Sequence, residues 1–165
     1  MKSPRRESSS LPIGVSALAP SIVHAAPSPG IFKAAEQALR QNGFTGYERT
    51  GEIHTGHVPV VIEIVYSNGK DTVEVDVRKK DSKVVSIEQE VAFSSIPANV
   101  RKAAASSGVD LKTCGIYQKA IYLPSKRIGY EFDDCEFTMR DVDVDAKTLK
   151  VVVEKNDHTM RDRDR

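Results

Sequence analysis

The feature that most constrains the fold of this chain is a pattern that occurs twice between residues 30 and 157. In each copy, a short segment with apolar residues at helical spacing precedes segments in which apolar and polar residues alternate. The helical segments, residues 31–44 and 96–109, align without a gap, and Gly43 and Gly108 end them. Glycine is common there because it enters left-handed backbone conformations at little cost. The pattern predicts an internal duplication.

The segments that follow each helix predict β-strands, because their apolar residues recur at every second position. Val73, Val75 and Val77, for example, would face a core while the charged residues between them face water. A break in this alternation predicts a bulge or irregular turn near Arg140. Four strands are expected after each helix, at residues 47–54, 60–66, 72–78, 84–91, 115–123, 128–134, 142–148 and 149–155.

The predicted fold class is α+β, with two tandem repeats that each contain a helix followed by a four-stranded antiparallel meander, and with the helices packed on one sheet face. Repeat 1 covers residues 31–93 and repeat 2 covers residues 94–157. A domain of about 60 residues buries only ~60% of the surface that its unfolded chain exposes, so one copy alone would be marginally stable. We therefore expect the copies to share a sheet or to pack helix against sheet as one compact unit.

The last predicted hairpin resembles that of the PepSY domain family. The family pattern reads approximately V-x-V-D-A-x-T-G-x-V, and residues 142–155 follow it, with Leu149 in place of the usual glycine. The equivalent run at residues 75–85 departs further, and Ser82 stands there at the glycine position. The residues that match the family pattern are Val142, Val144, Asp145, Ala146, Thr148 and Val151.

This resemblance implies an extracytoplasmic protein-binding module without chemistry of its own. PepSY domains occur in the propeptides of secreted metallopeptidases, where they act as intramolecular inhibitors or folding aids. Their layout is similar to that of tandem-repeat beta-lactamase inhibitor proteins, in which two units form one curved sheet that grips a partner enzyme. The resemblance supplies no catalytic residue that can be carried onto this chain.

The first 30 residues are interpreted as an export segment. Three basic residues precede an apolar stretch at residues 11–23, and small residues follow it, which is typical of a signal peptide over residues 1–25 with a flexible linker over residues 26–30. The alternative is a disordered Ser/Pro-rich tail. The apolar stretch falls short of the ~20 residues that a membrane-spanning helix needs, so no integral membrane association is expected. Residues 158–165 are expected to form a disordered tail.

Export affects the interpretation of Cys114 and Cys135, the two cysteines of the chain. A periplasmic or secreted location is oxidising, so a disulfide between them could persist. Such a bond would stabilise the fold by roughly 3 kcal/mol in the chain-entropy treatment of loop closure. The alternative is two unpaired thiols that pack as small apolar groups.

Composition and motifs point away from several classes of function. The formal net charge is only +1, which gives no general field for a polyanion, so no nucleic acid partner is expected. The chain contains neither a G-x-S-x-G turn nor a glycine-rich phosphate loop. We therefore expect no enzyme activity, no catalytic residues and no cofactor.

Two histidines of the chain are candidate metal ligands. His54 and His57 could approach each other in a loop, with Glu52 completing a divalent-ion site. No second pair of His or Cys residues has metal-ligand spacing, and His158 lies in the polar tail. Loop histidines without a metal are the favoured interpretation.

Asp141, Asp143 and Asp145 recur at alternate positions near the end of the chain. They do not form a calcium loop, because Ala146 stands where such a loop needs glycine and Val152 where it needs glutamate. On a strand, this spacing puts three carboxylates on one face, which is either simply solvated or able to attract a basic partner. The candidate partner-binding residues are Asp141, Asp143, Asp145, Tyr122 and Tyr130, with packing against a helix as the alternative for the tyrosines.

The sequence thus predicts an exported, non-catalytic, PepSY-like module that binds another protein and inhibits or modulates a secreted or envelope enzyme. The alternative is a periplasmic protein that binds a small ligand or a metal ion through His54, His57 or the aspartates. An enzyme ranks last, because no acid and base can be assigned.

Overall fold

The computed structural model describes residues 28–55, 60–138 and 140–155. The predicted signal peptide at residues 1–25 and the predicted tail at residues 158–165 lie outside these ranges. The first half consists of α1 (Pro29–Gln41), β1 (Glu48–Thr55), β2 (Val61–Ser67), β3 (Thr72–Arg78) and β4 (Lys83–Glu90). The second half consists of the 3-10 turn η1 (Phe93–Ser95), α2 (Ala98–Ala105), the 3-10 turn η2 (Leu111–Thr113), β5 (Ile116–Tyr122), β6 (Arg127–Asp134), the helical turn α3 (Cys135–Thr138), β7 (Arg140–Asp145) and β8 (Val151–Lys155).

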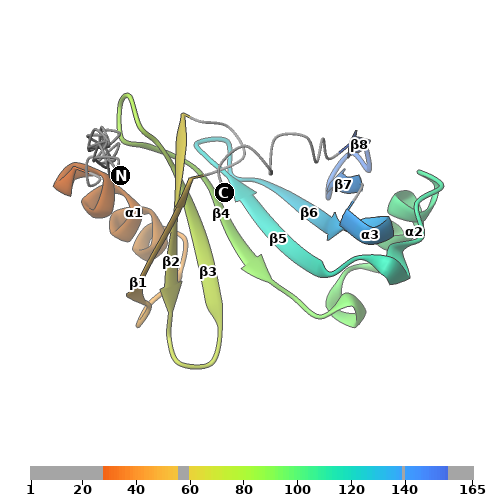
Figure 1. The fold of residues 1–165 in the computed structure, drawn as a ribbon, viewed down its shortest axis with the longest axis horizontal. Coiled ribbons are helices and arrows are strands. Elements are labelled where there is room, and N and C mark those ends of the chain that lie inside the picture. Colours follow the sequence, from red (N-terminus) through yellow and green to blue (C-terminus); the bar gives the residue numbers. More distant parts are fainter. Residues whose placement is uncertain (1–27, 56–59, 139, 156–165) are drawn as a thin grey trace, which may run out of the picture.

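The strands form one 8-stranded sheet in which the spatial order follows the chain order from β1 to β8. Every neighbouring pair is antiparallel. Figure 1 shows the strand direction turning from β1 at one end of the sheet to β8 at the other, with α1 and α2 near opposite ends. A progressive turn of this kind is the usual twist between adjacent strands.

The prediction of two tandem repeats, each with its own four-stranded meander, is wrong, although the α+β class agrees with the structure. β4 and β5, which the sequence assigned to different repeats, are hydrogen-bonded neighbours, with Glu88 opposite Ala120 at the centre of their register. Separate meanders would have left the edges of β4 and β5 unpaired, and unpaired edges are prone to association with other chains. The sheet therefore runs without a break through the predicted boundary at residues 93–94.

α1 covers the first half of the sheet. Its buried residues recur at helical spacing, as the sequence indicated, and the helix ends where Gly43 adopts a φ of +88°. The amide of Phe44 then donates to the carbonyl of Leu39 at 3.0 Å. The first core consists of Ile31, Ala35, Ala38 and Leu39 from α1 with Ile62, Ile64, Tyr66, Val73, Val75, Val77 and Ile87 from the sheet.

α2 covers the second half of the sheet, where a separate core forms. The disulfide between Cys114 and Cys135, with an S–S distance of 1.98 Å, lies within this core and confirms the predicted pairing. α3 precedes β7 at Arg140, where the break in alternation predicted an irregular turn. The buried residues of the second core are Ile96, Val100, Ala104, Val109, Leu111, Cys114, Phe132, Cys135, Val142 and Val144.

Both cores lie on the same face of the sheet, here called the helix-covered face. Val75 lies opposite Ile87, and Ile87 lies opposite Ile121. Ile121 in turn lies opposite Ile128. Phe132 of the second core follows Ile128 by four residues in β6 and so projects to the same side. The residues that alternate with these project to the opposite side of the sheet.

Within the described ranges, no helix combines the length and apolar character that crossing a membrane requires.

Candidate functional site: an acidic sheet face

The face opposite the helices carries a dense group of carboxylates, here called the acidic face. These residues occupy the polar positions of strands whose apolar positions fill the two cores, so the alternation that builds the cores also gathers the charges on the other side. The acidic face comprises Glu63, Glu74, Asp76, Glu88, Glu131, Asp133, Asp141, Asp143 and Glu154.

The strand register repeatedly places these carboxylates directly opposite one another. Like charges at directly opposed positions of an antiparallel pair destabilise a sheet, whereas opposite charges stabilise it. The arrangement therefore opposes folding and is not explained by sheet stability. The opposed pairs are Glu63 with Asp76, Glu74 with Glu88, Glu131 with Asp143, and Asp141 with Glu154.

The acidic face encloses a cavity of about 240 Å³ whose lining residues come from every strand from β2 to β8. All but two of the lining residues are Asp or Glu, the others being Ile116 and Gln118, and no Lys, Arg or His is among the described lining residues. In a flat sheet, six strand spacings of ~4.8 Å would separate Glu63 on β2 from Glu154 on β8 by about 29 Å. That both line one cavity indicates that the sheet curves around it.

Burial and mutual repulsion perturb the acids in this cavity. Burial first, and then the nearby charges of Glu131 and Asp76, raise the pKa of Glu88 to about 9. The hydrogen bond from Ser86 opposes this shift but does not cancel it. Glu88 therefore retains a proton at neutral pH in the unbound protein.

Three further acids have raised pKa values, with burial as the largest cause in each. The pKa of Glu131 rises to about 7, that of Asp133 to about 8 and that of Asp143 to about 6. Neighbouring carboxylates add to the rise in all three. Protons are therefore shared among these acids over the physiological pH range, and any cation that enters the cavity would displace them.

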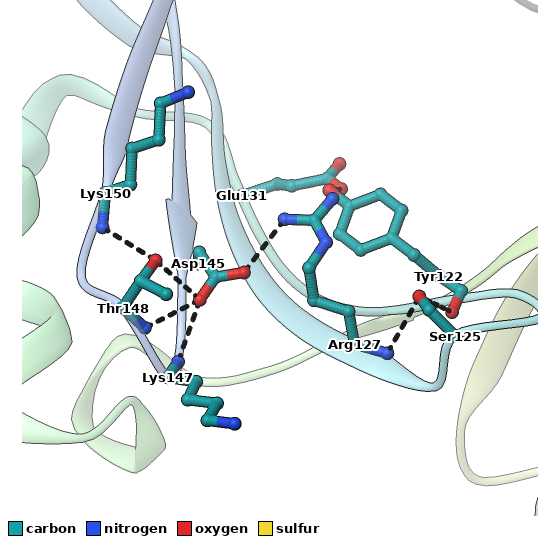
Figure 2. A network of polar contacts seen from close by, with 8 residues as sticks. All are labelled: Tyr122, Ser125, Arg127, Glu131, Asp145, Lys147, Thr148 and Lys150. Atoms are coloured by element: carbon teal, nitrogen blue, oxygen red, sulfur yellow. Dashed lines mark hydrogen bonds and ion pairs between the residues drawn. The ribbon is translucent and has the colours of Figure 1, made fainter.

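Tyr122 borders the acidic face and contacts three of its neighbours. Its hydroxyl donates to Glu131 Oε1 at 2.6 Å, and the Arg127 guanidinium stacks on its ring at 4.1 Å from the centroid (Figure 2). The ring also lies over Gly129, where an added Cβ would approach the Tyr122 ring to 2.8 Å. The absence of a side chain at Gly129 therefore allows Tyr122 to lie flat between Arg127 and Glu131.

Asp145 has a local structural role. It accepts hydrogen bonds from the amides of Lys147 and Thr148, at 3.0 and 2.7 Å, and an ion pair joins it to Arg127 at 3.1 Å (Figure 2). These hydrogen bonds, led by those from Thr148, hold the pKa of Asp145 well below its usual range. Asp145 thus fixes the β7–β8 turn and keeps Arg127 beside Tyr122, outside the acidic cavity.

The structure places the residues that the sequence predicted as one partner-binding face at several different locations. Asp141 and Asp143 line the acidic cavity, and Tyr122 is at its margin. Asp145 lies in the turn, as described above. Tyr130 lies opposite Val144 on the helix-covered face and packs against the second core.

Sequence reasoning missed the acidic residues of β2, β3, β4 and β6. Each is a polar residue in a strand where apolar and polar residues alternate, and such a residue is usually interpreted as simply facing solvent. Their relationship becomes visible only when the strands are placed in register across one continuous sheet. The missed residues are Glu63, Glu74, Asp76, Glu88 and Glu131, together with Glu154 of β8.

The metal sites considered from the sequence find no geometric support in the described structure. His54 belongs to β1, where its backbone is opposite Glu63, while His57 and His158 lie outside the described residues. Asp141 and Asp143 are in a strand and not in a calcium loop. Across residues 28–55, 60–138 and 140–155, no group of three or more His, Cys, Asp or Glu residues is arranged to hold a metal ion.

The fold and site together define an α+β protein with a curved antiparallel sheet that is apolar and helix-covered on one side and acidic on the other. Comparison with known proteins adds no relative, because no family model, curated protein or solved structure matches this chain.

Proposed function

We propose that this protein is an exported protein-binding module whose acidic face receives a positively charged segment of another protein, and that it thereby inhibits or modulates a secreted or envelope enzyme. No covalent step is part of this function. A lysine- or arginine-rich loop or strand of the partner would enter the acidic cavity and neutralise the carboxylates that line it.

The observation that carries this proposal is the set of opposed carboxylates on the acidic face. The pairs Glu74–Glu88 and Glu131–Asp143 lower the stability of the free protein whenever both of their carboxylates are ionised. A cationic partner would convert this repulsion into attraction, because each of its charges would lie between two carboxylates. Local arrangements that oppose folding in this way are typical of functional sites.

The rigidity of the sheet also supports binding. The carboxylates are anchored on strands that pack against two cores, so few of their degrees of freedom remain to be lost on association. Electrostatic complementarity would mainly accelerate encounter and select the partner, and its effect would fall as salt is added.

The proposal that the protein is exported draws on the Cys114–Cys135 disulfide, which persists most readily in an oxidising compartment. The resemblance to PepSY domains, which the sequence suggested, points to the same location and to the same kind of function.

A comparison of two double variants tests the proposed function. Glu74→Gln with Glu154→Gln removes two charges from the acidic face, while Asp71→Asn with Asp110→Asn removes two exposed charges elsewhere. Each protein would be used to capture partners from a secreted or envelope extract, with elution by a salt gradient. We expect the wild type and the Asp71/Asp110 variant to retain the same partner at low salt and the Glu74/Glu154 variant to lose it.

Equal capture by both double variants would contradict the proposal, as would a retained partner that does not elute with salt. Loss of folding does not complicate the result, because Gln is isosteric with Glu and removes a like-charge repulsion. Thermal unfolding of each variant would verify that both remain folded.

A further inference from the structure

A second cavity, of about 340 Å³, lies on the helix-covered side of the sheet between α1 and the start of β1. Its walls include the apolar or aromatic residues Leu39, Phe44 and Tyr47, and the charged residues that line it are Glu36, Arg40, Glu48 and Arg49. Tyr66 of β2 also lines it. This cavity is separate from the acidic face, because Tyr66 belongs to the first core on the opposite side of the sheet.

Tyr66 is the unusual residue of this cavity. Its side chain is only 1% exposed, and its buried hydroxyl has no hydrogen-bond partner in the described part of the chain. A buried tyrosine hydroxyl normally finds a partner, and leaving such a group unpaired costs about 1 to 3 kcal/mol. The hydroxyl therefore has an unused capacity to bind.

The hydroxyl is available as a donor and lies near a cation. Burial raises the pKa of Tyr66 to about 12, so the phenol keeps its proton at physiological pH. Its hydroxyl is close enough to Glu36 and Arg49 to respond to the charge of both, and both residues line the same cavity. Arg49 is also directly opposite Tyr66 in the β1–β2 register.

The two arginines of the cavity differ in their partners. Arg40 pairs with Glu36 along α1, at 4.0 Å. Arg49 stacks on the ring of Phe32 at 4.1 Å, and among the described residues it makes no ion pair with a carboxylate. A guanidinium that stacks on a ring still presents its N–H groups in its own plane, where they can donate to the two oxygens of a carboxylate.

The apolar walls of the cavity indicate that a ligand would also have an apolar part. Phe44 and Tyr47 pack edge to face with their ring centroids 5.7 Å apart, beside Leu39. A flat or branched apolar group would fit against these rings, while its polar end reached Arg49 and the Tyr66 hydroxyl.

We propose that the cavity between α1 and β1 binds a small monocarboxylate with an apolar or aromatic body, whose carboxylate accepts hydrogen bonds from the Tyr66 hydroxyl and the Arg49 guanidinium. This site is independent of the acidic face, and its occupancy requires no partner protein.

Phenylacetate is a suitable probe, and phenylacetamide is its uncharged counterpart. In an NMR titration of the oxidised protein, we expect phenylacetate to cause saturable shifts of the backbone amides of residues 39–49 and 66, and phenylacetamide to cause none. Tyr66→Phe should weaken phenylacetate binding about tenfold, because a hydrogen bond to a charged group is lost. The variant should fold, because the hydroxyl it removes has no partner in the described structure.

A matched pair of arginine variants completes the test. Arg49→Gln should abolish binding, whereas Arg101→Gln, which also removes a guanidinium stacked on a phenylalanine ring, should leave it unchanged. The proposal would be overturned by the absence of saturable shifts at millimolar phenylacetate, by equal binding of phenylacetamide, or by unchanged affinity in Tyr66→Phe.

Discussion

Glu74 of β3 lies directly opposite Glu88 of β4, on the face of the sheet that no core residue covers. Two ionised carboxylates at these positions would repel each other, so the pair is more stable when one of them is protonated or when a cation lies near both. Burial, followed by the charges of Glu131 and Asp76, raises the pKa of Glu88 to about 9, so Glu88 keeps its proton at neutral pH. Protonation and stability are therefore linked on the acidic face, and binding of the proposed cationic partner would be linked to both.

The stability of the protein should fall as the pH rises. Asp143, Glu131, Asp133 and Glu88 have folded-state pKa values of about 6, 7, 8 and 9, compared with about 4 in an unfolded chain. Between the unfolded-chain pKa and the folded-state pKa values, the folded protein holds more protons than the unfolded chain. The stability that these four acids contribute is therefore fully present below about pH 4 and is lost as the pH rises through their folded-state pKa values. Urea denaturation from pH 5 to about pH 9 should show a steadily decreasing free energy of unfolding.

A single amide substitution should remove much of this pH dependence. Glu88→Gln cannot ionise, so we expect its stability relative to the wild type to increase by several kcal/mol between pH 5 and pH 9. Glu48→Gln, at an exposed position outside the acidic face, is the matched control and should leave the profile unchanged. A free energy of unfolding that increases between pH 5 and pH 9 would show that the acidic face is not protonated as described.

The close approach of Tyr122 to Gly129 should make this glycine intolerant of any side chain. In Gly129→Ala, the new Cβ would come within 2.8 Å of the Tyr122 ring, so the ring must move away from Arg127 and Glu131. We expect a loss of about 1 to 3 kcal/mol in the free energy of unfolding, as is usual for overpacking. Chemical denaturation would measure the loss, and the NMR shifts of the Tyr122 ring would report its displacement.

Gly115→Ala is the control for this effect. There the added Cβ would meet the Cβ of Asp134 at 3.5 Å, an ordinary contact distance. Equal destabilisation by the two substitutions would mean that loss of glycine in the β5–β6 region, and not the contact with Tyr122, is responsible.

Local features of the fold could be predicted from the sequence because short-range physics determines them. The burial of Ile31, Ala35 and Leu39 follows from helical spacing, and that of Val73 and Val75 follows from strand alternation. The disulfide followed from the expected compartment and the count of two cysteines.

The sequence left open whether the two halves share one sheet, and it did not predict the acidic face, because both depend on pairing between distant strands. Alternation shows which side of its own strand Glu88 occupies, but not that β4 pairs with β5 or that Glu131 is nearby. The same limit applies to Tyr130, which the sequence analysis grouped with Asp143: the β6–β7 register places Tyr130 opposite Val144 and therefore on the other face. Register across neighbouring strands, which sequence periodicity does not encode, separates these residues.

Reduction of the disulfide should destabilise the second core more than the first. Cys114 and Cys135 both pack in the second core, with Cys135 fully buried, while no cysteine is in the first core. Cys114→Ala with Cys135→Ala should lower the free energy of unfolding by roughly 3 kcal/mol. Hydrogen exchange should then accelerate in α2, β6 and β7 before it does in β2 and β3. Uniform acceleration in all of these elements would show that the two cores unfold as one unit.

The β7–β8 turn should tolerate glycine better than the leucine it contains. Leu149 adopts a φ of +58° at the position where the resembled family usually has glycine, and this left-handed conformation costs a residue with a side chain roughly 1 to 2 kcal/mol. We expect Leu149→Gly to raise the free energy of unfolding by up to about 1 kcal/mol, since lost side-chain contacts and greater chain entropy offset part of the relief. Ala146→Gly in the same turn, where φ is not positive, should instead lower it by about 0.5 to 1 kcal/mol. Chemical denaturation would measure the free energy of unfolding of both variants. A decrease of similar size in both would contradict the prediction, because it would mean that the contacts of the Leu149 side chain stabilise the turn by more than its left-handed conformation costs.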